Sequence, residues 1–119
     1  MREVARDIKE RTLEFAVRIV KLVDAIPKST AGSVIARQIM RSGSSVGANV
    51  EEAQGAHSKR DFARRMNIAR SEARETLYWL RLIEKSEIMK SERLMMIIEE
   101  ADELVRILTT IVKKSRVSR

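Results

Sequence analysis

The stretch SKRDFARRMNIARSEARETLYWLRLI, residues 58–83, decides the fold of this chain. Ser58 followed by Asp61 has the spacing of a capping box, in which a side-chain oxygen accepts a free backbone N–H of the first helical turn. Apolar residues then recur every three or four positions, which places them on one face of an α-helix. This stripe consists of Phe62, Met66, Ala69, Ala73, Leu77, Leu80 and Ile83. The stretch therefore predicts one long amphipathic helix.

The N-terminal half of the chain repeats this periodicity twice. Pro27 ends a first helix of about Arg2 to Ala25, because proline cannot continue a helix. Ser29 or Thr30 can cap a second helix that fades near residues 55–57. The first stripe consists of Val4, Ile8, Thr12, Phe15, Ile19, Leu22 and Ile26, and the second of Ile35, Ile39, Ser42, Val46, Asn49 or Val50, and Ala53.

A fourth helix follows a short polar connection at residues 86–90, with Ser91 as its candidate cap. Its stripe consists of Leu94, Ile98, Ala101, Val105, Leu108 and Val112. The basic tail, residues 113–119, is expected to fray. Four amphipathic helices with short joins force antiparallel neighbours. We therefore predict an all-α fold, an antiparallel up-down-up-down four-helix bundle that forms a single domain over residues 1–119.

The composition limits the classes of function. The chain has no cysteine, so neither disulfides nor thiolate metal ligands are available. Charged residues interrupt the N-terminus where a signal peptide needs an apolar segment. No stretch approaches the roughly 18 apolar residues that a membrane span needs. We expect a soluble, cytoplasmic protein without contact to a membrane.

The positive charge of the chain indicates an anionic partner. Lys and Arg outnumber Asp and Glu by 24 to 17, a formal net charge of +7. On a wheel of about 100° per residue, one flank of the third helix collects residues that can grip phosphates and stack on a base. The candidate nucleic-acid-binding residues are Arg60, Arg70, Arg74, Tyr78 and Arg81. Such a row is equally typical of a solvated helix face.

The middle of the second helix has unusually small residues. Gly43 and Gly47 favour a tight helix crossing, since glycine inside a helix costs about 1 kcal/mol and needs a packing reason. A phosphate-cradling loop is the weaker interpretation, because the lysine of a P-loop is missing. Asn49, with Glu52 after it, is interpreted as a structural polar core position that fixes helix register by hydrogen bonding across the bundle.

The same region offers the only polar cluster that resembles a catalytic or metal site. Glu51, Glu52 and His57 do not share a helical face, and general acid/base work needs a positioned pair. A di-iron bundle needs Glu-x-x-His pairs on two helices, whereas this chain has one histidine. We therefore expect no enzyme activity, no cofactor and no metal.

A second apolar patch on the third helix indicates self-association. Ile68, Trp79 and Leu82 lie away from the core stripe, and exposed apolar patches usually mark interfaces. We interpret these three residues as an oligomer interface, although Trp79 is also suited to covering a bundle edge.

Residues 41–53, RSGSSVGANVEEA, with residues 58–62 and 72–80, resemble a known family. They are similar to the bacterial four-helix-bundle proteins encoded in intervening sequences of 23S ribosomal RNA genes. The resemblance implies a ring-like homopentamer with a basic surface, a role in binding nucleic acid, and no assigned reaction. The relatives of this family include the accessory protein of diversity-generating retroelements, which associates with a reverse transcriptase. The family positions of interest map onto Ser45, Asn49, Glu52, Arg74 and Trp79.

Together, these features favour a non-enzymatic homo-oligomer that binds RNA or DNA through phosphate contacts. The alternative is a protein-interaction scaffold or adaptor, such as an accessory subunit of a reverse transcriptase or of another protein partner.

Overall fold

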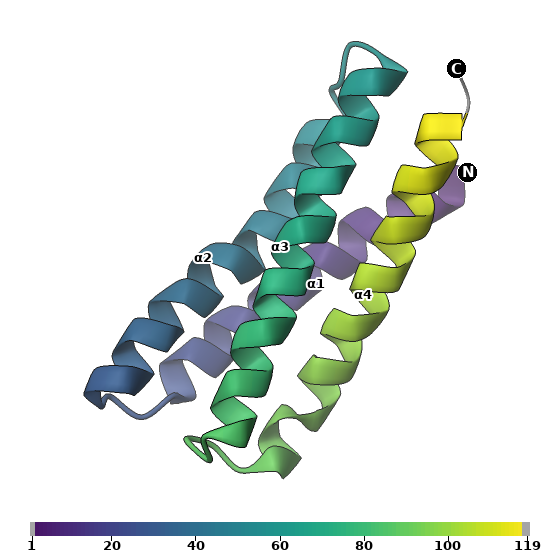
Figure 1. Cartoon of the computed structure of the whole chain (residues 1–119). Coiled ribbons are helices and arrows are strands. Elements are labelled where there is room, and N and C mark those ends of the chain that lie inside the picture. The colour runs from purple at the N-terminus through teal and green to yellow at the C-terminus, as the bar shows by residue number, and fades with distance from the viewer. Residues whose placement is uncertain (1, 118–119) are drawn as a thin grey trace.

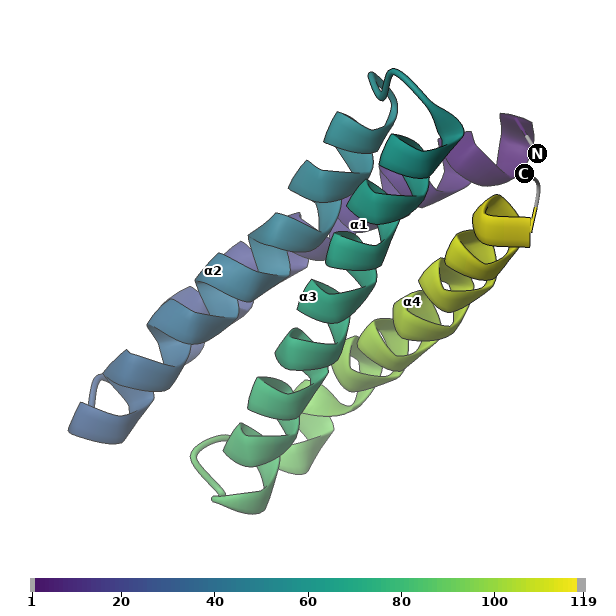
Figure 2. The same cartoon turned by 45° about the horizontal axis from the view of Figure 1, so that its top comes forward.

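The computed structural model describes the backbone of residues 2–117 and the side chains of residues 8–116. Within them it contains four helices and no strand: α1 (Arg2–Ala25), α2 (Thr30–Ala53), α3 (Lys59–Lys85) and α4 (Ser91–Val117). Consecutive helices run antiparallel, and α1 begins at the end of the bundle where α4 finishes (Figures 1 and 2). The predicted all-α, up-down-up-down bundle is confirmed.

The helix starts follow the predicted capping residues at two of three places. The Oγ of Ser29 accepts from the backbone N–H of Gly32 at 3.0 Å, and the Oγ of Ser58 accepts from that of Asp61 at 3.0 Å. The predicted cap at Ser91 is wrong by one position, because Ser91 is already helical. Residues 113–117 continue α4, and residues 118–119 lie outside the described part.

The core follows the predicted stripes, with a systematic error in α4. There, Ile98 and Val105 are only half-buried, whereas Ile97, Leu104 and Ile111 are buried. A bundle helix packs against two neighbours and the central core, so its buried face is wider than a single stripe. Thr76 is also fully buried, although the predicted stripe of α3 did not include it. Val4 lies outside the described side chains.

α1 and α2 approach closely at the two glycines of α2. A Cβ added at Gly43 would lie 2.8 Å from Cγ1 of Ile19, and one added at Gly47 would lie 3.1 Å from the carbonyl oxygen of Thr12. Both contacts are with α1, and real Cβ atoms rarely approach so near. The interpretation of these glycines as a tight helix crossing is therefore confirmed.

Gly43→Val is expected to lower the free energy of unfolding by about 1–3 kcal/mol, because the added carbons must displace Ile19 from a packed core. The matched control is Gly55→Val, since the nearest atom to a Cβ at Gly55 is 3.8 Å away. Urea unfolding followed by circular dichroism measures both. Equal stabilities for the two variants would show that the crossing at Gly43 can relax.

The contact of α1 with α4 is much less extensive than its contact with α2. In Figures 1 and 2, α1 runs obliquely behind α3. Near the middle of α4, Nη2 of Arg11 lies 2.8 Å from Oε1 of Glu100 and 2.7 Å from Oε1 of Glu103. These hydrogen bonds raise the pKa of Arg11. The guanidinium group of Arg11 is therefore charged in the folded protein at every pH below the usual arginine pKa.

Arg11→Met is expected to lower the free energy of unfolding by about 1–2 kcal/mol, because a part-buried charged hydrogen-bonding pair is removed while a similar side-chain volume remains. Arg106→Met is the control, since the pair of Arg106 with Asp102 is well exposed within one helix and is worth about 0.3–0.5 kcal/mol. Hydrogen exchange should also show faster exchange confined to α1. An unaltered exchange rate in α1 would argue against Arg11 as the link to α4.

Candidate nucleic-acid interface

The predicted row of basic residues follows one flank of α3. Arg60, Arg74 and Arg81 are exposed, and Arg70 is half-buried, with its Nε donating to Oδ1 of Asn67 at 2.9 Å. Tyr78 lies in the same row and is 61% exposed. The five candidate residues therefore share a face, as the periodicity predicted.

The cations of this row have no ion-pair partner among the described side chains. Among the other arginines, Arg64 pairs with Asp61 at 2.8 Å, Arg106 pairs with Asp102, and Arg41 pairs with Glu72 and Glu75. Some arginines outside the row also lack a partner among the described side chains, namely Arg18, Arg37, Arg65, Arg93 and Arg116. The hydrogen bond from Arg64 also lowers the pKa of Asp61, so that this pair is fully charged. Within residues 8–116, no ion pair involves Arg60, Arg70, Arg74 or Arg81. Their charge is uncompensated and available to an anion.

Three of the five candidates meet in a groove between α3 and α4. This hollow of about 580 Å³ is lined by Arg74, Leu77, Tyr78, Arg81, Leu82 and Lys85 of α3 and by Asp102 and Val105 of α4. Arg60 and Arg70 lie outside it, nearer the start of α3. The sequence analysis missed Lys85, although its place four residues after Arg81 puts it on the same flank.

The opposite flank of α3 is tied to α2. The indole Nε1–H of Trp79 donates to Oε2 of Glu75 at 2.9 Å, and Glu75 is also held by Arg41 of α2. Trp79 and Leu82 are half-buried and pack against the core, and Ile68 is half-buried as well. The expectation that a single protomer leaves these three residues exposed is therefore wrong. Their role in an oligomer interface stays a prediction.

An exposed apolar stripe on α1 was missed by the sequence analysis. Leu13, Val17 and Val20 are 65%, 47% and 44% exposed, and their spacing places them on one side of the helix. Beside them, a groove between α1 and α2 is lined by Leu13, Ala16, Ser44, Gly47 and Ala48, among others. The signal was present in the sequence as valines and a leucine outside the core stripe.

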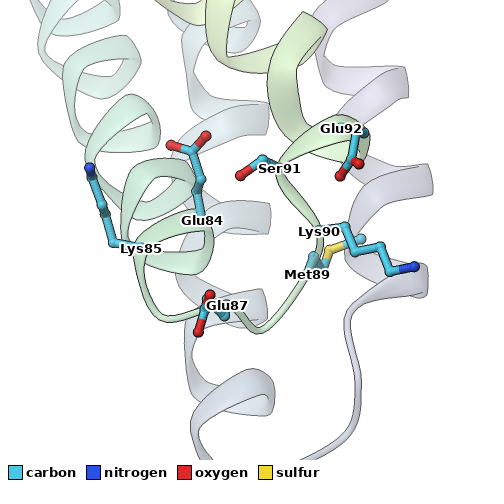
Figure 3. A pocket seen from close by; sticks show the side chains of 7 residues that line it. All are labelled: Glu84, Lys85, Glu87, Met89, Lys90, Ser91 and Glu92. Atoms are coloured by element: carbon cyan, nitrogen blue, oxygen red, sulfur yellow. The ribbon is translucent and has the colours of Figure 1, made fainter.

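Another hollow lies at the α3–α4 connection. It measures about 530 Å³ and is lined by Glu84, Lys85, Glu87, Met89, Lys90, Ser91 and Glu92. In Figure 3, the hydroxyl group of Ser91 is directed toward Glu84, whereas the ammonium groups of the two lysines project away to opposite sides. No group of three or more metal-ligating side chains occurs among the described residues.

Comparison with known proteins shows the family of this chain. The model of the 23S rRNA-intervening sequence protein family matches residues 6–110. This chain belongs to that family. This chain is 40% identical in sequence to a protein of unknown function from the S23 ribosomal protein family of Bacteroides thetaiotaomicron VPI-5482, which has a crystal structure. That match has a TM-score of 0.86 and covers 92% of this chain and 98% of the other. No curated protein matches the sequence.

The predicted polar core of this 23S rRNA-intervening sequence protein is corrected by the structure. Glu52 is exposed, and the amide of Asn49 donates to the carbonyl oxygen of Ser45, at 2.9 Å, within α2 itself. The cross-bundle bond predicted for Asn49 is therefore wrong. The pair that joins two helices in the core is Ser42 and Thr76, whose hydroxyl oxygens lie 2.8 Å apart.

The remaining polar candidates of this chain lie apart from one another at the surface. Glu51 and His57 are exposed, and Glu51 lies 3.6 Å from the ammonium group of Lys9. Over the part of the chain that is described, no helix has the length and apolar character needed to cross a membrane.

Proposed function

We propose that this 23S rRNA-intervening sequence protein binds RNA or DNA through phosphate contacts from the uncompensated basic flank of α3, without catalysing a reaction. The observation that carries the proposal is the absence of ion-pair partners, among side chains 8–116, for the arginines of this flank. The family's name mentions ribosomal RNA, so RNA is tested as a ligand beside DNA. A cytoplasmic place of action is part of the proposal, because ribosomal RNA is found there in bacteria.

The length of the basic row suits a nucleic-acid backbone. From Arg60 to Arg81 the helix rises about 30 Å, at about 1.5 Å per residue. One turn of a duplex rises about 34 Å. A rigid helix with cations along this distance can therefore follow several successive phosphates. Such contacts position the protein and carry little sequence information.

Arg74→Gln combined with Arg81→Gln is expected to weaken binding to every nucleic acid tested, because two phosphate contacts are lost. For a duplex, the slope of log K against log salt concentration should fall by about 2, since each contact contributes about 0.9. The control is Arg37→Gln with Arg93→Gln, which removes the same charge from exposed positions outside the row. Fluorescence anisotropy at several salt concentrations measures both variants. Equal losses in both would reduce the proposal to a general effect of net charge.

Self-association is the second part of the proposal, with the homopentamer of the family resemblance as the expected assembly. In a head-to-tail ring, each protomer needs two different patches, because its first patch binds the second patch of the neighbouring protomer. The α1 stripe is one apolar surface, and the half-buried residues Ile68, Trp79 and Leu82 of α3 are the candidate for the second. They support a ring in which one surface of each protomer meets the other surface of the next.

Val17→Lys and Trp79→Ala are each expected to lower the particle mass in light scattering, because each variant loses one of the two patches. Mixing the variants should form dimers and stop there, since each then offers the patch that the other lacks. Met95→Lys is the control, as Met95 is 53% exposed on α4. Thermal unfolding checks that each variant is folded. An unchanged mass for both variants would remove these surfaces from the assembly.

The alternative function is a protein-interaction scaffold, which the same α1 stripe supports. A monomeric wild-type protein that binds no nucleic acid at low salt would favour it. The stripe would then receive another protein, such as a reverse transcriptase, in place of a second copy.

A further inference from the structure

The groove between α3 and α4 has an apolar part that binding of phosphates alone does not explain. Its lining includes the apolar side chains of Leu77, Leu82 and Val105 beside the cations of Arg74, Arg81 and Lys85. Phosphates bind to cations and backbone N–H groups and gain nothing from an apolar wall. The apolar part of the groove therefore indicates a ligand that also carries a non-polar surface.

Tyr78 supplies a flat ring at the edge of this groove. It is the most exposed aromatic side chain among the described residues, and its ring meets that of Trp79 edge to face, with centroids 5.2 Å apart and planes at 74°. Trp79 is fixed in turn by its hydrogen bond to Glu75, and Glu75 by Arg41. The ring of Tyr78 is thus supported on one side by a fixed neighbour, which lowers the entropic cost of stacking on it.

The charges of the groove favour an anionic ligand. Arg74, Arg81 and Lys85 make no ion pair with the described side chains, and the carboxylate in the lining, Asp102, is already paired with Arg106. The volume of about 580 Å³ lies within the roughly 300–1,000 Å³ that is usual for small-ligand sites. A planar, partly apolar ring attached to a phosphate meets all of these conditions.

We propose that this groove receives one unpaired nucleotide, with its base stacked on Tyr78 and its phosphates held by Arg74, Arg81 and Lys85. Bases inside a duplex are already stacked and cannot enter such a groove, whereas those of bulges, loops and single strands can. The protein therefore prefers nucleic acid with an unpaired base over a continuous duplex of equal charge. This inference rests on the proposed function and adds the structural class of its ligand.

The test compares two blunt-ended RNA duplexes that differ by one bulged nucleotide, titrated at one low salt concentration by fluorescence anisotropy. Wild-type protein is expected to bind the bulged duplex about 5- to 150-fold more tightly, the range for stacking one base on an aromatic ring. Tyr78→Ala should remove this preference, so that the two duplexes bind with equal affinity. Tyr78→Phe is the matched control and should keep the preference, because the ring remains.

Trp79 gives a second readout that needs no variant. It is the only tryptophan of the chain, and its ring contacts Tyr78, so its emission should change with the bulged duplex and not with the continuous one. Equal wild-type affinities for the two duplexes, or a preference that survives in Tyr78→Ala, would overturn the inference and leave the phosphate contacts standing. No binding of either duplex would overturn the proposed function and this inference together.

Discussion

A buried contact between Thr76 and Ser42 fixes how α3 lies against α2, and the rest of the molecule depends on it. Both side chains are fully buried, with their hydroxyl oxygens 2.8 Å apart, and Oγ1 of Thr76 lies 2.8 Å from the carbonyl oxygen of Glu72. Thr76 keeps this partner in its own helix, whereas the only partner described for the Ser42 hydroxyl is Thr76, and leaving a buried hydroxyl unpaired costs about 1–3 kcal/mol. Sliding or rotating α3 against α2 would separate the pair in a site where water cannot replace it. This contact therefore selects one register among those that the apolar stripes alone permit.

That register decides which flank of α3 meets which neighbour. With Thr76 turned toward α2, the acidic residues Glu72 and Glu75 reach Arg41 of α2. The arginines on the other flank are directed toward α4 and solvent, where Arg74 and Arg81 line the groove. The same helix thus holds the bundle together through one flank and presents cations on the other. Fold and candidate site are linked through the geometry of this single helix.

The sequence was enough to predict the bundle, because helix ends and buried stripes depend on local patterns. Ser58 and Pro27 set helix ends within a few residues of their own positions. Gly43 indicates that another helix packs close by, because it has no side chain in the middle of a helix. The predictions for Asn49 and Glu52 failed because a residue at the edge of a stripe can satisfy its polar groups within its own helix or in water. Choosing between these outcomes needs the positions of the neighbouring helices. The α3–α4 groove could not be predicted for the same reason, since Val105 and Asp102 lie on a different helix from the arginine row.

The basic row of α3 also destabilises its own helix, and this cost helps to distinguish a binding surface from a solvated face. Arg70 and Arg74 are four residues apart, as are Arg81 and Lys85, and like charges at this spacing destabilise a helix by about 0.2–0.5 kcal/mol per pair. The other flank of α3 avoids such repulsion by placing Glu72 and Glu75 against a cation of α2. On a solvated face without a binding partner, a glutamate at one position of each pair would replace the repulsion by attraction. An anion bound along the row would offset the repulsion, so the like-charge spacing favours a binding surface over an ordinary solvated face.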